Sequence, residues 1–176
     1  DYTVAVKHEV FNQGGQAVTP QLYLQLARDG NPPDGESSFY FTFTGPAVYT
    51  GAAKFQKIDF KDISKGSAAH EKAANDGWVA MVQHYFASAW LVGTPGPREF
   101  RTSQVAANHF AVAMVMPLGE VAAGASKAHE AVLFAGPQEE EKLAALAPGL
   151  ELAKDYGWLT VLSKPLFWLL ARLPGM

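Results

Sequence analysis

The chain has 176 residues, no cysteine and a net charge of −3, with 48% apolar and 18% charged residues. A chain of this length can bury a core without a disulfide or a metal, and the missing cysteines exclude thiolate catalysis and cysteine-based zinc sites. Its lysines and arginines are scattered rather than clustered, which argues against nucleic acid as a partner.

The first part of the chain alternates apolar and polar residues with a period of two, which is typical of strands. Residues 2–10, 21–26, 39–45 and 55–60 show this pattern, and Gly45-Pro46 is expected to end the third strand. Lysines interleave the fourth strand, as they do at sheet edges, so we expect that strand at an edge. Residues 64–76 are polar and rich in alanine, and predict a loop or a short helix.

The middle of the chain continues as strands and then changes character. Residues 77–91 are long, aromatic and strand-like, and residues 100–105, 110–116 and 128–134 predict further strands. After Gly136 a helix is expected, with Pro137 as its first residue, glutamates in its first turn and Pro148-Gly149 as its stop. The pattern therefore predicts a mainly β protein, a sandwich with helices at its C-terminal end.

Residues 155–176, here called the C-terminal stretch, are rich in leucine and tryptophan. Lys164 and Pro165 interrupt this stretch, which disfavours a transmembrane helix. A helix packed on the sandwich and a helix lying in the membrane interface both fit the periodicity. On such a helix, seven residues share an arc of roughly 120°: Trp158, Leu159, Leu162, Leu166, Leu169, Leu170 and Leu173.

Motifs that carry chemistry are missing from the sequence. The five histidines show neither HxH nor HExxH spacing, and there is no GxSxG, GxGxxG or P-loop pattern. We therefore predict no catalytic residue, no metal and no cofactor. The aromatic residues of 77–91 suggest either a sugar platform or the core and rim of a sandwich, and the second is favoured because aromatic residues are common in strands.

Four segments of the sequence occur in an order that is familiar. FTFTGPAVYT, KFQKIDFKDI, GWVAMVQHYFASAWL and GPQEEEKLAALAPGLELAKDYGWLTVLSKPLFWLL together resemble the large periplasmic loop of bacterial members of the YidC/oxidase-assembly family of membrane protein insertases. The positions that we single out for this resemblance are Gly77, Trp78, Gln83, Tyr85, Phe86, Trp90, Asp155, Tyr156, Gly157 and Pro165.

The resemblance implies a fold and a division of the chain. The fold is a β-supersandwich, similar to galactose mutarotase, with C-terminal α-helices and with the first part of the sandwich missing from this chain. Residues 1–136 would be part of the periplasmic sandwich and residues 137–154 a linking helix. Residues 155–176 would be an amphipathic interfacial helix that leads toward the second transmembrane segment, which favours the interfacial interpretation of the seven apolar residues.

The resemblance also implies a function at the periplasmic face of the bacterial inner membrane, within a multi-pass protein. The domain would be a non-catalytic scaffold and partner-contact surface of an insertase and chaperone, acting with or without the Sec translocon. Its partners would be SecDF and SecYEG, with SecF touching segments that resemble residues 1–61, and nascent membrane proteins bound through the full-length protein. The alternative is a sugar-binding or aldose-epimerase-like sandwich domain, which rests on fold analogy alone.

Overall fold

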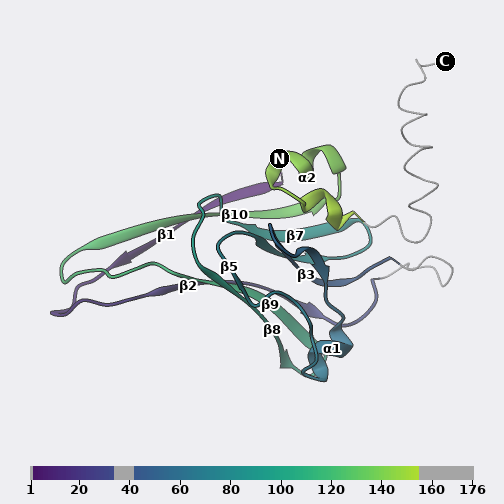
Figure 1. Ribbon diagram of the computed structural model, residues 1–176, viewed down its shortest axis with the longest axis horizontal. Coiled ribbons are helices and arrows are strands. Elements are labelled where there is room, and N and C mark those ends of the chain that lie inside the picture. The colour runs from purple at the N-terminus through teal and green to yellow at the C-terminus, as the bar shows by residue number, and fades with distance from the viewer. Residues whose placement is uncertain (1, 34–41, 155–176) are drawn as a thin grey trace, which may run out of the picture.

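The computed structural model describes residues 2–33 and 42–154. In this part of the chain, ten strands form two antiparallel sheets, and a short helical segment lies over one of them (Figure 1). The paired strands β1 and β10 extend toward one end of the long axis (Figure 1). The mainly β sandwich with few helices that the sequence predicts is confirmed.

The two sheets differ in size. The six-stranded sheet has, in order, β1 (Thr3–Phe11), β10 (Ser126–Pro137), β7 (Phe86–Leu91), β6 (Trp78–Val82), β3 (Gly45–Thr50) and β4 (Lys54–Lys57). The four-stranded sheet has β2 (Gln21–Asp29), β9 (His109–Pro117), β8 (Arg98–Ala106) and β5 (Ala73–Ala74). The helical segments are α1 (Phe60–Ser64), α2 (Glu140–Leu146) and the 3-10 helix η1 (Leu150–Ala153).

The centre of the six-stranded sheet is buried on both faces. Val79 and Met81 of β6 belong to the core between the sheets, whereas Trp78, Ala80 and Val82 belong to a second core beneath α2 and η1. All five residues of β6 are therefore buried, which explains why this strand is a continuous apolar run rather than an alternating one. We call α2 and η1 together the helical cap.

The lysine-rich strand lies where the sequence predicts it. The strand β4 is the outermost strand of the six-stranded sheet, paired with β3 alone among the described strands, and Lys54 and Lys57 stand at its two ends. Both lysines are exposed, so their charges lie at the edge and discourage pairing with another chain. The prediction of an edge strand is confirmed.

The prediction that Gly45-Pro46 ends a strand is wrong. These residues begin β3, which lies between β4 and β6, and the aromatic residues 39–41 lie outside the described part of the chain. Pro46 stands opposite Met81 near the start of the strand, a position at which a residue without an N–H is tolerated. Its carbonyl oxygen accepts a hydrogen bond from the Ile58 N–H at 3.0 Å.

Two further boundaries differ from the sequence prediction. The fourth strand ends at Lys57, and Phe60 begins α1, where it stacks on Phe110 with 4.8 Å between ring centroids. A five-residue helix is too short to produce a helical period, so its apolar residues resembled a strand. Pro137 belongs to β10, opposite Phe86, and α2 begins three residues later at Glu140.

Candidate functional site

The helical cap is attached to the sheet through one tryptophan. Trp78, at the start of β6, is 3% exposed, and its ring stacks on that of Tyr49 with centroids 5.3 Å apart and planes 7° from parallel. Its indole N–H donates a hydrogen bond to the Pro148 carbonyl oxygen at 3.0 Å, between α2 and η1. The backbone of Trp78 is thus part of the sheet, while its indole N–H is bonded to the cap.

Two glycines make room for this arrangement. Gly77 has φ +106°, and a Cβ there would collide with the Tyr49 carbonyl oxygen. Gly149 has φ +76°, and a Cβ there would collide with the Tyr49 ring. Both positions favour glycine for conformational and steric reasons together. We call Tyr49, Gly77, Trp78, Pro148 and Gly149 the joint.

The cap buries its own apolar residues around the joint. Leu143 of α2 and Leu150 of η1 are fully buried, and Ala153 is 1% exposed. These three residues share one core with Trp78 and with Ala80, Val82, Ala87, Ala89, Leu91 and Phe134 of the sheet. The cap therefore continues the core of the sandwich as far as Ala153 and is not a loosely tethered appendage.

A buried arginine holds the backbone of the joint from the opposite sheet. Arg98, the first residue of β8, is 2% exposed, and its guanidinium donates hydrogen bonds to the carbonyl oxygens of Gly77 and Thr94 at 2.7 Å and of Gly96 at 3.2 Å. Burial lowers the pKa of the Arg98 guanidinium, and the charge of Asp76 opposes this shift. The Arg98 side chain thus links the start of β8 to the start of β6.

A cavity of about 420 Å³ lies beside the joint. Its walls include Tyr49, Trp78, Leu91 and Leu146, and Arg98 is among its polar lining residues. Among the described residues, no group of three or more histidines, cysteines or carboxylates is placed to hold a metal ion.

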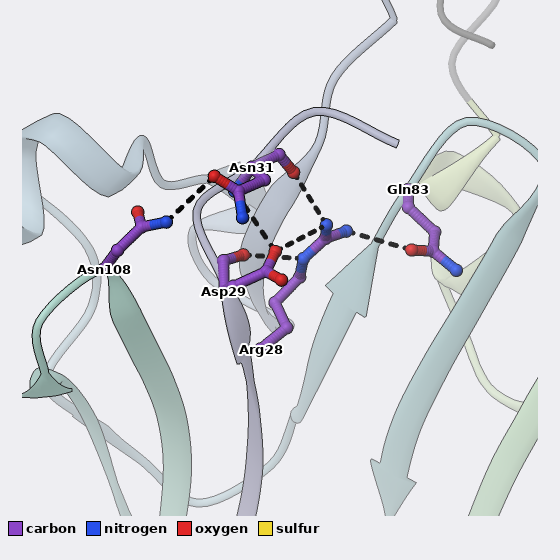
Figure 2. Close-up of polar contacts among 5 residues, drawn as sticks. All are labelled: Arg28, Asp29, Asn31, Gln83 and Asn108. Atoms are coloured by element: carbon purple, nitrogen blue, oxygen red, sulfur yellow. Dashed lines mark hydrogen bonds and ion pairs between the residues drawn. The ribbon is translucent and has the colours of Figure 1, made fainter. Parts of the chain in front are cut away.

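A second polar cluster connects the two sheets at the turn between β6 and β7. Figure 2 shows Arg28, at the end of β2, donating a hydrogen bond to the Gln83 side-chain oxygen at 2.9 Å. Arg28 also donates to the carbonyl oxygens of Asp29 at 2.8 Å and Asn31 at 2.9 Å. The Asn31 backbone N–H, with help from Arg28, lowers the pKa of the Asp29 carboxyl. Residue Gln83 thus links this turn to the four-stranded sheet.

The hydrogen bond between Arg28 and Gln83 can be tested by a double-mutant cycle. We expect Arg28→Ala and Gln83→Ala each to lower the free energy of unfolding, with a coupling energy between them of about 1 kcal/mol, because the bond involves a charged donor. Chemical denaturation of the two single variants and the double variant measures this coupling. A coupling energy of zero would show that the hydrogen bond does not hold the two sheets together.

The other predicted positions lie at different places. Trp90 is half-buried and donates its indole N–H to the Gln25 carbonyl oxygen at 3.1 Å, which ties β7 to β2. Tyr85 and Phe86 are 68% and 52% exposed. Neither Trp78 nor Trp90 offers an open face of the kind that a sugar platform needs, so the sugar-binding alternative is not favoured.

The predicted residues of the C-terminal stretch lie outside the described residues. They are Asp155, Tyr156, Gly157, Trp158, Leu159, Leu162, Pro165, Leu166, Leu169, Leu170 and Leu173. Within residues 2–33 and 42–154, no helix has the length and apolar character that crossing a membrane requires. The interfacial role of these residues stays a prediction.

Sequence reasoning did not single out Tyr49 or Arg98. Tyr49 lies 29 positions before Trp78 and Arg98 lies 21 positions after Gly77, so no short spacing connects either residue to the joint. Gly77 and Trp78 were found through the resemblance, and Pro148-Gly149 through its helix-stop chemistry. A proline-glycine pair after an apolar helix was the one local signal of the joint.

The fold and the joint define an antiparallel β-sandwich domain with a helical cap fixed to one sheet. A family described as "YidC periplasmic domain" matches residues 1–169 of this chain. The chain belongs to this family.

Relatives with long matches have one name in common. The chain is 58% identical over 174 residues to the "Membrane protein insertase YidC" of Cupriavidus necator, which is 99% of this chain and 31% of that protein. It is 51% identical to the protein of that name from Janthinobacterium sp. and 53% identical to that from Ralstonia nicotianae, with 98% of this chain and 31% of each relative covered. The chain thus spans about a third of the length of these relatives.

Proposed function

We propose that this chain is a non-catalytic scaffold domain of an inner-membrane protein insertase, held at the periplasmic face by its C-terminal stretch. The family supports the periplasmic side, and the name shared by its relatives supports an insertase. The rest of such a protein would carry out insertion, while this domain would serve by its position and by the surfaces that it offers to partners.

The observation that carries this proposal is the joint. Trp78 binds the Pro148 carbonyl oxygen, and the core continues to Ala153, two residues before the C-terminal stretch begins. The described structure thus ends on a segment that is anchored in the core of the sandwich. An apolar helix held in this way can fix the orientation of the sandwich relative to a membrane surface.

The partner surfaces that we propose are the edge strands of the two sheets within residues 2–33 and 42–154. Residues 1–61, which the resemblance connects with SecF, contain β1 and β4 at the two ends of the six-stranded sheet and β2 at one end of the four-stranded sheet. Edge strands offer backbone groups and side chains to a partner strand or loop. The domain would thus meet SecDF or SecYEG along an edge, and nascent membrane proteins through the full-length protein.

Vesicle binding tests the membrane contact. We expect Leu162→Asp with Leu169→Asp to weaken binding of the chain to phospholipid vesicles at least about a hundredfold, since each well-buried leucine contributes about 1.5–3 kcal/mol. Flotation through a density gradient measures the bound fraction.

A matched variant controls for the added charge. Thr160→Asp with Ala171→Asp places the same two carboxylates on the side of the predicted helix opposite the seven apolar residues, where we expect little change in vesicle binding. Circular dichroism and thermal unfolding check that both variants keep the sandwich. Equal vesicle binding by the wild-type chain and the double leucine variant would contradict the membrane role of the C-terminal stretch.

A further inference from the structure

We propose that the turn between β6 and β7 is a second membrane contact, in which Tyr85 and Phe86 enter the boundary between lipid headgroups and acyl chains. These adjacent side chains are 68% and 52% exposed, a pair of large aromatic residues at one hairpin turn. Tyrosine and phenylalanine at the tip of a turn suit this boundary because an aromatic ring gains there from leaving water, while the tyrosine hydroxyl can stay hydrated.

The turn is held rigidly from three directions. Gln83 and Phe86 exchange backbone hydrogen bonds of 3.0 and 3.2 Å, which close the turn. Gln138, which follows β10, donates its side-chain amide to the carbonyl oxygens of Gln83 at 2.8 Å and Phe86 at 3.1 Å, and its backbone N–H to that of Tyr85 at 2.9 Å. Arg28 holds the Gln83 side chain (Figure 2).

A rigid turn favours binding of its exposed aromatic residues to a membrane surface. The backbone of the turn needs no further ordering when it meets a partner, so little conformational entropy is lost on contact. The His84 ring, which contacts the Thr42 hydroxyl, lies edge to face with the Tyr85 ring at 3.9 Å between centroids. The Tyr85 side chain is thus supported from behind.

Two carboxylates near the turn are paired, while Glu140 and Glu141 follow in the first turn of α2. Asp29 is paired with Arg28 at 3.4 Å and Glu139 with Lys142 at 2.7 Å, so these two carboxylates already have cationic partners. The Lys142 ammonium also lies 5.8 Å from the centroid of the Tyr2 ring, which is 45% exposed and packs against Gly136 near the end of β10. The Lys142 ammonium is thus shared between Glu139 and the Tyr2 ring.

The position of the turn points to a bilayer rather than to another occupant. Along the long axis of the molecule, the β6–β7 turn lies toward the same end as η1, which precedes the C-terminal stretch (Figure 1). If that stretch lies on a membrane, as the proposed function states, the end of the domain that carries the turn is the end joined to the segment on that surface. This inference rests on that proposed function, and two contacts would fix the tilt of the sandwich where one would not.

A single-site fluorophore tests the contact. The chain has no cysteine, so Tyr85→Cys provides one labelling site for an environment-sensitive dye such as NBD. With vesicles of phosphatidylethanolamine and phosphatidylglycerol, we expect a blue shift and a rise in emission at this site. The matched control is Tyr23→Cys, since Tyr23 is 50% exposed on β2 in the other sheet, and its emission should not change.

Substitution of the aromatic pair provides the second measurement. We expect Tyr85→Ser with Phe86→Ser to weaken vesicle binding at least about tenfold, because two rings lose their transfer from water, whereas Tyr23→Ser should bind as the wild-type chain does. Both side chains are exposed, so the variants should fold, and circular dichroism checks this. If the variant with Tyr85→Ser and Phe86→Ser bound vesicles as tightly as the wild-type chain does, the proposal would be overturned.

The outcomes separate this inference from the proposed function. If the chain binds vesicles through its leucines while the emission of the dye at position 85 stays that of a dye in water, the proposal of a second contact is wrong and the scaffold proposal stands. If the double leucine aspartate variant binds normally while the dye still shifts, the turn is a contact and the C-terminal stretch is not. A dye shift that depends on protein concentration without vesicles would overturn the proposal in favour of a second copy of the chain.

Discussion

Replacing Trp78 by alanine is expected to lower the free energy of unfolding by about 3–5 kcal/mol, the range typical of a large buried aromatic residue. The substitution removes the stack on Tyr49, leaves the Pro148 carbonyl oxygen without its donor and opens a space between sheet and cap. Chemical denaturation measures the loss. Limited proteolysis around residues 140–153 should also become faster, because the cap loses its attachment.

Two matched variants separate the contributions to this effect. Trp78→Phe keeps an aromatic ring but not the indole donor, so we expect part of the loss, with about 1 kcal/mol from the hydrogen bond. Trp90→Ala removes a half-buried tryptophan that faces the other sheet, and it should leave the protease sensitivity of the cap unchanged. If Trp90→Ala released the cap as Trp78→Ala does, the joint would not be the specific attachment point.

Replacing Arg98 by methionine is the second change with a large expected effect. Methionine fills much of the space but leaves three carbonyl oxygens without this donor, those of Gly77, Thr94 and Gly96. A hydrogen bond from a charged donor contributes about 1.5–3 kcal/mol, so we expect the loss of three such bonds to lower the free energy of unfolding by at least about 3 kcal/mol. Thermal and chemical denaturation measure this loss.

An exposed arginine on the same strand is the control. Arg101 makes a surface ion pair with Glu99 at 2.7 Å, and both side chains are more than half exposed. Arg101→Met should change stability by no more than about 0.5 kcal/mol, because exposed ion pairs contribute little. The stability of Arg98→Lys should lie between that of Arg98→Met and that of Arg101→Met, since one ammonium cannot reach all three carbonyl oxygens in the same geometry. Equal stability of Arg98→Met and Arg101→Met would contradict the role assigned to Arg98.

Periodicity predicted the strands that have one face in a core and one in solvent. The strands β1, β2 and β8 keep an alternating pattern over much of their length, and their approximate positions followed from the sequence. The strand β6 is buried on both faces, so only its apolar, aromatic character suggested a strand. The end of β4 and the start of α1 were missed, because a five-residue helix cannot show a helical period.

The joint was harder to predict than the fold. Its glycines act through steric contacts with Tyr49, and its buried arginine acts on a carbonyl oxygen in another sheet. Contacts of this kind join residues that are far apart in sequence, and no local spacing encodes them. The resemblance identified Gly77 and Trp78 without giving their physical role, which the structure assigns to the attachment of the cap.

The burial of Ala153 places a fixed point of the sandwich directly before Lys154, the last described residue. If the C-terminal stretch meets a membrane, as proposed, Lys154 is the one residue that separates it from this buried anchor. A pull that arrives at Lys154 would pass through Ala153 into the core that holds Trp78 and Tyr49. Inserting a few glycines and serines after Lys154 would place a flexible segment between this core and the C-terminal stretch.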